Sequence, residues 1–129
     1  MIAGIGTDLV EIARIAAVLA RHGERFRRRV LTPGERALAP SFAGTEAEAR
    51  WLAKRYAAKE AAAKAFGTGI GAQLSFQDLV VGREPSGRPT LAFAGAGAAL
   101  AARQGVSRAH LSLSDERGHA LAFVLLERD

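Results

Sequence analysis

The 129-residue sequence contains no cysteine. A disulfide framework, a thiolate nucleophile and a cysteine-based zinc site are therefore excluded. Aromatic residues make up only 6% of the chain, and much of the 49% hydrophobic share is alanine, which buries little area per side chain. A monomer would have a modest core, so we expect a shared subunit interface. The length predicts one domain over residues 1–129.

Long apolar runs are also missing, and no stretch is long enough to span a bilayer. The N-terminal segment has no basic region, and its apolar run meets Asp8 too early for a signal peptide. We expect a soluble, cytoplasmic protein. The net charge of +5 and the pI near 10.7 favour an anionic partner: nucleic acid, a phosphorylated metabolite, an acidic protein or a membrane surface.

Hydrophobic periodicity predicts an α+β fold with a mainly antiparallel sheet and a long central helix. Helices are expected over residues 10–21, 24–29, 45–66 and 95–104, with a further helix start at Thr32–Glu35. Strands are expected over residues 2–9, 74–81, 89–93, 110–114 and 120–126. Gly4 and Gly6 in the first strand would let another backbone approach closely. Gly23 would end or bend the first helix.

Glu60 and Lys64 lie four residues apart in the expected long helix, so their side chains project from one face. They can form a surface ion pair that stabilises the helix by roughly 0.2–0.5 kcal/mol. They can equally place a carboxylate and an ammonium group where a metal ion and a phosphate are held side by side. The residues alone leave both interpretations open.

Asp8 ends an otherwise apolar strand, where a carboxylate is costly to bury without a partner. It could cap the following helix, or it could supply a metal ligand. A hard cation such as Mg²⁺ takes one or two protein carboxylates and leaves its other positions to substrate phosphate and water. Asp8 and Glu60 together would meet that requirement.

A basic stretch surrounds Phe26, with arginines at positions 21, 25, 27, 28 and 29. Most such stretches are solvated helical faces. An apolar side chain within positive charge also suits the docking of an acidic helix, or of RNA through phosphate contacts and stacking. The glycine-rich segment Gly67–Gly71 can be a plain helix stop or a backbone surface for a phosphate ligand.

At these residues the sequence resembles the holo-acyl-carrier-protein synthase family. The matching segments are Gly4–Ile12, Arg55–Gly71, Ser86–Pro89 and His110–Ser114, in the order of the family and spread over nearly the whole chain. One departure is that the turn usually reads Gly-Lys-Pro, whereas Arg88 stands here between Gly87 and Pro89. Positive charge is retained, but the two side chains bind phosphate differently. Arginine binds phosphate through two parallel N–H groups, whereas lysine acts as a single point charge.

The resemblance implies that Asp8 and Glu60 bind Mg²⁺ and that Lys64 faces the phosphates of coenzyme A, which makes these three the expected catalytic residues. The remaining expected coenzyme A contacts are Arg55, Gly67, Gly87, Arg88, Pro89 and His110. For the acidic carrier protein, the expected docking residues are Arg14, Arg25, Phe26 and Arg29.

The resemblance also implies transfer of 4′-phosphopantetheine from coenzyme A to a serine of an apo-acyl-carrier protein, with release of 3′,5′-ADP. It implies a homotrimer with sites at subunit interfaces, and neither nucleic acid nor a membrane as partner. Glu60, a Mg²⁺-bound water and Glu35 are the candidate bases, although Glu35 also suits a helix capping box. The competing interpretation, a basic non-catalytic RNA- or ribosome-binding module, explains the pI and the arginines but not Asp8, Glu60 and Lys64.

Overall fold

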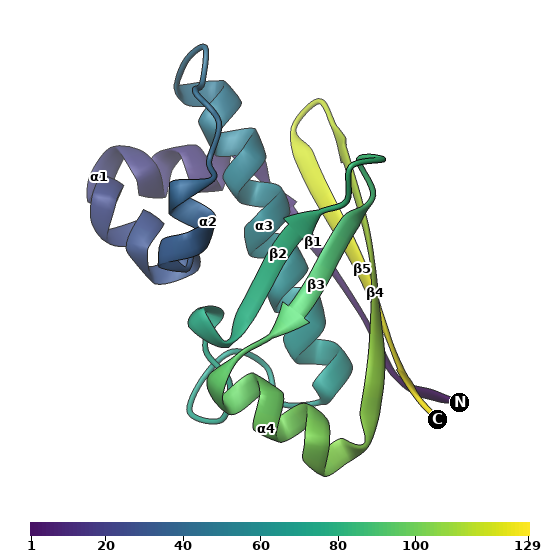
Figure 1. Cartoon of the computed structure of the whole chain (residues 1–129). Helices are drawn as coiled ribbons and strands as arrows, with labels where there is room; N and C mark the ends of the chain where they lie inside the picture. Colours follow the sequence, from purple (N-terminus) through teal and green to yellow (C-terminus); the bar gives the residue numbers. More distant parts are fainter.

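The computed structural model describes all residues of the chain, 1–129, and has an α+β architecture (Figure 1). One antiparallel sheet has the strand order β1–β5–β4, and a second antiparallel sheet pairs β2 with β3. The strands are β1 (Ile2–Glu11), β2 (Leu79–Arg83), β3 (Pro89–Phe93), β4 (Val106–Glu116) and β5 (His119–Arg128). The expected α+β class with antiparallel strands is confirmed, and the strands divide between two sheets.

The long central helix α3 (Thr45–Phe66) has the bounds that the sequence predicts and lies across the inner face of the three-stranded sheet (Figure 1). Its contact face consists mainly of alanines that are almost completely buried, so helix and sheet can approach closely. The helix ends at Gly67, whose left-handed backbone (φ 82°) lets its N–H return to the carbonyl of Lys64.

Gly4 and Gly6 determine how close that approach is. A β-carbon on Gly4 would lie 2.0 Å from the carbonyl oxygen of Ala65, and one on Gly6 would lie 2.0 Å from that of Ala61. No side chain fits at such a distance. The expected close backbone approach is therefore confirmed, and its partner is α3.

The first helix, α1 (Ile12–Val30), is interrupted by a kink at Gly23, where the backbone is not helical (φ 36°, ψ −110°). It begins two residues later than predicted because β1 continues to Glu11. The kink turns the second half of α1 back over α3. The short helix α2 (Pro33–Ala37) follows, with the predicted capping box between Thr32 and Glu35.

A buried ion pair fastens these helices together. Lys59 of α3 is completely buried, and its Nζ donates to Glu35 Oε1 at 2.7 Å, to the Val30 carbonyl at 2.7 Å and to the Phe76 carbonyl at 3.0 Å. All three ammonium protons have acceptors, as a buried charge requires. Removing one partner of such a pair destabilises a protein by about 3–5 kcal/mol.

The strand predicted over residues 74–81 is wrong in its first half. Residues Phe76–Asp78 form a short 3₁₀ helix, η1, and β2 begins only at Leu79. The side chain of Asp78 accepts hydrogen bonds from the backbone N–H and the hydroxyl of Ser75, and such local bonds compete with strand pairing. The predicted helix α4 (Gly95–Gln104) is confirmed.

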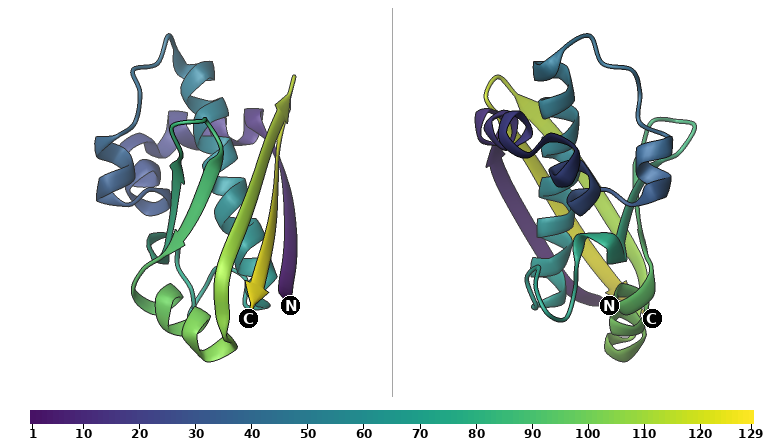
Figure 2. Two further views of the ribbon diagram at one scale, coloured as in Figure 1. Left: turned by 45° about the vertical axis from the view of Figure 1, so that its right-hand side comes forward. Right: turned by 90° about the vertical axis from the view of Figure 1, so that its left-hand side faces the viewer.

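The three-stranded sheet is covered on one side only. Its inner side chains, such as Leu111, Val124 and Leu126, pack in the core against α3. No helix lies on its outer face (Figure 2). That face exposes the apolar residues Ile5, Leu9, Leu121 and Phe123. No helix of the structure combines the length and apolar character that crossing a bilayer requires.

Candidate active site

Asp8 faces the central helix because alternate residues of β1 point to the same side of the sheet. Gly4, Gly6 and Asp8 share the inner side, and the two glycines bring α3 close enough for contact. The Lys64 Nζ atom donates to Asp8 Oδ1 at 3.1 Å and to the carbonyl of Thr7 at 2.9 Å. The alternative that Asp8 caps the following helix is wrong, since Asp8 lies within β1 and Glu11 occupies the N-cap of α1.

Glu60 lies one turn before Lys64 on α3 and is half-buried. Burial raises the pKa of its carboxyl group, and the negative charge of Asp8 raises this pKa further, against smaller opposing effects of Tyr56, Lys64 and Arg14. Lys64 pairs with Asp8 across the helix–strand contact. The surface Glu60–Lys64 pair that the spacing also allowed is therefore not formed.

Two carboxylates that repel each other form a site that a cation would stabilise. Asp8 and Glu60 are the residues that could hold one, and no cluster of three or more histidine or acidic side chains is present. Any ion here would complete its coordination with water or substrate oxygens. Oxygen ligands, two carboxylates and open positions suit Mg²⁺, and the lysine beside them suits a phosphate.

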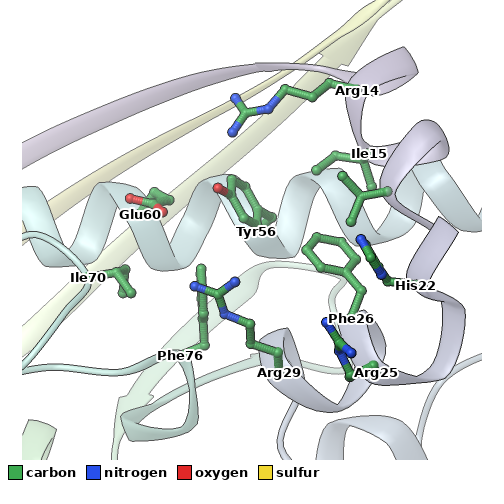
Figure 3. Close-up of a pocket in the computed structure, with 11 residues that line it drawn as sticks. Arg14, Ile15, His22, Arg25, Phe26, Arg29, Tyr56, Glu60, Ile70 and Phe76 are labelled. Carbon is green, nitrogen blue, oxygen red and sulfur yellow. The ribbon is translucent and has the colours of Figure 1, made fainter.

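A cavity of about 430 Å³ extends from Glu60 along both halves of α1 (Figure 3). It is lined by the four predicted docking residues Arg14, Arg25, Phe26 and Arg29. The kink at Gly23 makes this possible, because it lets the second half of α1, with Arg25 and Arg29, face the same cavity as Arg14 of the first half. The arginines gather around the cavity, so the structure brings the predicted docking residues and a predicted catalytic carboxylate into one pocket.

Aromatic rings form the floor of this cavity. Phe26 is buried rather than exposed, and its ring centre lies 6.2 Å from that of Tyr56, which lies 5.4 Å from that of Phe76. Arg14 lies over the Tyr56 ring at 6.0 Å, and Arg29 lies over the Phe76 ring at 5.8 Å. Phe26 therefore shapes the pocket from below, and the cationic side chains form its rim.

One arginine of the basic stretch has a structural partner instead. Arg27 forms a two-point ion pair with Glu48 of α3, with contacts of 2.5 and 2.8 Å. This pair holds the second half of α1 on the central helix. The basic stretch is thus divided between a cavity-lining face and a packing face.

Arg55, a predicted coenzyme A contact, lies on a different face of α3 from Glu60. Its guanidinium stacks on the Trp51 ring at 4.0 Å and lines a second cavity, of about 590 Å³, together with Arg83 of β2. Burial and the positive charge of Arg83 lower the pKa of Arg55 to about 10, against the influence of Glu35. Arg55 is thus a desolvated cation beside a second cation, an arrangement that favours an anionic ligand.

The other predicted coenzyme A contacts lie in separate places. Gly87 (φ 95°) and the exposed Arg88 lie in the turn between β2 and β3, and Pro89 begins β3. This turn lies toward the first residues of α3, whereas Gly67 ends that helix at the opposite end (Figures 1 and 2). His110 does not open a strand as predicted, because it lies within β4, on the outer side of the sheet, where it contacts Glu127. One subunit alone does not gather the predicted contacts into one cleft.

Sequence reasoning missed Tyr56, Trp51 and Arg83 as site residues. Tyr56 precedes Glu60 by one helical turn, and this spacing was the available signal. Nothing local distinguished Trp51 or Arg83. Glu35, a candidate base, is buried with its oxygens bonded to Lys59 and to the backbone N–H groups of Thr32 and Val81, so it is a structural residue.

A carboxylate pair next to a lysine, joined to an arginine-lined cavity, defines a protein that handles anionic, phosphorylated ligands. Comparison with known proteins identifies the family within this class. The family model described as the 4′-phosphopantetheinyl transferase superfamily matches residues 4–124. This chain therefore belongs to the 4′-phosphopantetheinyl transferase superfamily.

Relatives of known name agree with this assignment. The holo-[acyl-carrier-protein] synthase of Alkalilimnicola ehrlichii is 53% identical over 127 residues, which cover 98% of each chain. The crystal structure of the synthase from Neisseria meningitidis has a TM-score of 0.90 and 42% identity, covering 99% of this chain and 100% of that one. The structure of the Helicobacter pylori synthase in complex with coenzyme A has a TM-score of 0.82 and 30% identity, covering 95% of this chain and 99% of that one. The predicted resemblance is confirmed.

Proposed function

We propose that this protein transfers the 4′-phosphopantetheine group from coenzyme A to a serine of an apo-acyl-carrier protein. The observation that carries the proposal is the shared site of Glu60, which lines the arginine-rimmed cavity and lies beside Asp8 and Lys64. An acidic protein docked on the arginines would meet a phosphate held at the carboxylates. The names of the relatives point to the same reaction.

In this reaction the serine oxygen forms a bond to the β-phosphorus of coenzyme A while the bond to 3′,5′-ADP breaks. The serine hydroxyl loses its proton to a base. Of the two candidate side chains, Glu60 lines the arginine-rimmed cavity, whereas Glu35 is bonded to Lys59. Lys64 offers positive charge to the phosphate oxygens, on which negative charge develops. Most of the rate enhancement should come from positioning and electrostatics, as in phosphoryl transfer in general.

Mg²⁺ is the metal that fits this site. Asp8 and Glu60 would hold it, and the pyrophosphate of coenzyme A would supply further oxygen ligands. When bound, it would neutralise charge on the pyrophosphate and orient the leaving group. The support in this chain is that Asp8 and Glu60 lie near each other beside Lys64: burial, and after it the negative charge of Asp8, raises the pKa of the Glu60 carboxyl group.

We assign carrier docking to Arg14, Arg25 and Arg29, with Phe26 below them. Complementary charge steers an acidic partner toward such a rim and fixes its orientation. The aromatic floor offers apolar contact to a side chain of the partner. The remaining coenzyme A contacts are assigned to Lys64, Gly67, Arg55, His110 and the turn Gly87–Pro89.

We further propose a homotrimer in which neighbouring subunits complete each other's coenzyme A site, with residues 1–129 as one transferase domain. The dispersed positions of Lys64, Arg55 and His110 within one subunit support this. So does the uncovered apolar outer face of the sheet, because exposed apolar patches of this kind mark interfaces.

The experiment combines the purified protein with coenzyme A, Mg²⁺ and an apo-acyl-carrier protein, followed by mass spectrometry of the carrier. The expected result is a carrier heavier by one phosphopantetheine group, with 3′,5′-ADP released in equal amount. A serine-to-alanine carrier variant is the control and should stay unmodified. An unmodified wild-type carrier, together with salt-sensitive RNA binding, would support the RNA-binding interpretation instead. That alternative is not favoured, because the arginines enclose a cavity that ends at a carboxylate.

A further inference from the structure

Tyr56 is held in one orientation by its surroundings. Its ring packs between those of Phe26 and Phe76, at 6.2 and 5.4 Å between centres, and Arg14 lies over it at 6.0 Å. A ring with neighbours on several sides has little rotational freedom. The direction of its hydroxyl group is therefore determined by the packing of α1 and η1 on α3.

That hydroxyl points along α3 toward the carboxylate of Glu60 (Figure 3). Both side chains line the same cavity, so the hydroxyl and the carboxylate face one shared space. A tyrosine hydroxyl has an ordinary pKa of about 10, so it is protonated at neutral pH and can donate a hydrogen bond. The half-buried carboxylate thus has a neutral, rigidly mounted donor one helical turn away.

From this geometry we infer that Tyr56 is a positioning residue that orients the Glu60 carboxylate for divalent-cation binding. The inference rests on the proposed function, in which Asp8 and Glu60 are the metal ligands. Metal-binding carboxylates are commonly oriented by hydrogen bonds from neighbouring groups, and loss of such a group lowers metal affinity by about 10–100-fold. Lys64 bonds instead to Asp8 and to the Thr7 carbonyl, so its ammonium group is directed at β1.

The same residue joins the two halves of the site. Its ring is part of the cavity floor under Arg14, and its hydroxyl orients the carboxylate of Glu60 in the inference above. Replacing the hydroxyl alone therefore separates the two functions. Tyr56→Phe keeps the ring and its packing and removes only the donor.

The test measures binding of Mn²⁺, a paramagnetic substitute for Mg²⁺, to the full chain with saturating coenzyme A by electron paramagnetic resonance. We expect Tyr56→Phe to weaken Mn²⁺ binding about tenfold, while the KM for the carrier protein stays within about twofold because the ring remains. Arg25→Ala is the matched control. It removes a cation from the rim of the same cavity and leaves the rings around Tyr56 in place, so it should raise the carrier KM and leave Mn²⁺ affinity unchanged.

Unchanged Mn²⁺ affinity in Tyr56→Phe would overturn the inference, and so would an equal loss in Arg25→Ala, because the effect would then not be specific to the Tyr56 hydroxyl. Circular dichroism and thermal melting establish that each variant is folded. Glu60→Gln separates this inference from the proposed function. If Glu60→Gln binds Mn²⁺ as the wild type does, the metal role of Glu60 fails; if it loses Mn²⁺ and Tyr56→Phe does not, only the role of Tyr56 fails.

Discussion

The ammonium group of Lys64 lies 3.1 Å from the Asp8 carboxylate and joins the central helix to the first strand across 56 residues of sequence. Because Lys64 is engaged in this way, Glu60 faces Asp8 without a lysine bound to it. The result is the pair of carboxylates that the proposed Mg²⁺ site requires. The same lysine, half exposed, can turn its remaining donor capacity toward a phosphate.

Glu60→Gln tests this arrangement directly. We expect the transfer rate to fall by about 100-fold or more, because the change removes a metal ligand and a candidate base at once. Glu48→Gln is the matched control, since Glu48 lies on the same helix but bonds to Arg27 outside the cavity that Glu60 lines. Full activity of Glu60→Gln at ordinary Mg²⁺ concentration, measured by mass spectrometry of the carrier, would disprove its role.

Charge reversal at the rim of the arginine cavity should separate the two substrates. In the double variant Arg14→Glu and Arg25→Glu, the KM for the carrier should rise about tenfold or more, because attraction to an acidic partner becomes repulsion. The KM for coenzyme A should stay within about twofold.

Arg103→Glu on α4 is the control for charge reversal elsewhere on the surface, because this exposed residue lies outside the cavity. Steady-state kinetics with each substrate varied in turn provides the measurement. Equal losses for carrier and coenzyme A would contradict the assignment of this surface to the carrier.

Local patterns in the sequence predicted the elements well where they are regular. The long helix over residues 45–66 and its stop at Gly67 came from periodicity and a glycine C-cap. The strand prediction for residues 74–78 was wrong because it used only the alternation of apolar residues. The hydrogen bonds between Ser75 and Asp78 hold this segment in a 3₁₀ helix instead.

The site could be predicted only in part from local patterns. Asp8 and Lys64 were both candidate residues, yet their contact depends on the close approach of α3 to β1 at Gly6. Tyr56 was missed because its importance comes from three neighbours brought together by folding.

Gly6→Ala should destabilise the protein, because the new β-carbon would lie 2.0 Å from the Ala61 carbonyl oxygen. Forcing α3 away from β1 should cost about 1–3 kcal/mol, as overpacking does elsewhere. It should also weaken the Asp8–Lys64 contact. Gly118→Ala is the control, because nothing lies within 4 Å of the position that its β-carbon would take. Urea denaturation compares the two, and equal midpoints would show that the contact at Gly6 can relax freely.

The Arg27–Glu48 pair predicts a specific pH dependence of stability. A hydrogen bond from Arg27 is the main cause that lowers the pKa of Glu48 below its ordinary value. Since the folded-state pKa is the lower one, the pair stabilises the fold above the unfolded-state pKa of about 4.3, and this contribution is lost as the pH falls through the folded-state value.

Glu48→Gln should therefore be less stable than the wild type at pH 7, by at most about 1 kcal/mol. The difference should shrink as the pH is lowered below about 4. Thermal melting of both proteins between neutral and acidic pH measures it. A difference that stays constant down to acidic pH would mean that the Glu48 charge is not the source of the stabilisation.

The uncovered face of the three-stranded sheet predicts how the assembly can be broken. Phe123 lies on the central strand β5 and is 39% exposed on that face. Phe123→Asp should leave the subunit folded, because the side chain does not belong to the core against α3. It should nevertheless prevent association, because a charge would be buried without a partner in the interface.

Size-exclusion chromatography with light scattering should give a trimer mass for the wild type and a monomer mass for the Phe123→Asp variant. Transfer activity should fall with the loss of the neighbouring subunit. Ala102→Asp on the exposed side of α4 is the control and should remain trimeric. A monomeric wild type that is fully active would refute the shared site, because one subunit would then bind coenzyme A without help from the distant His110 and Arg55.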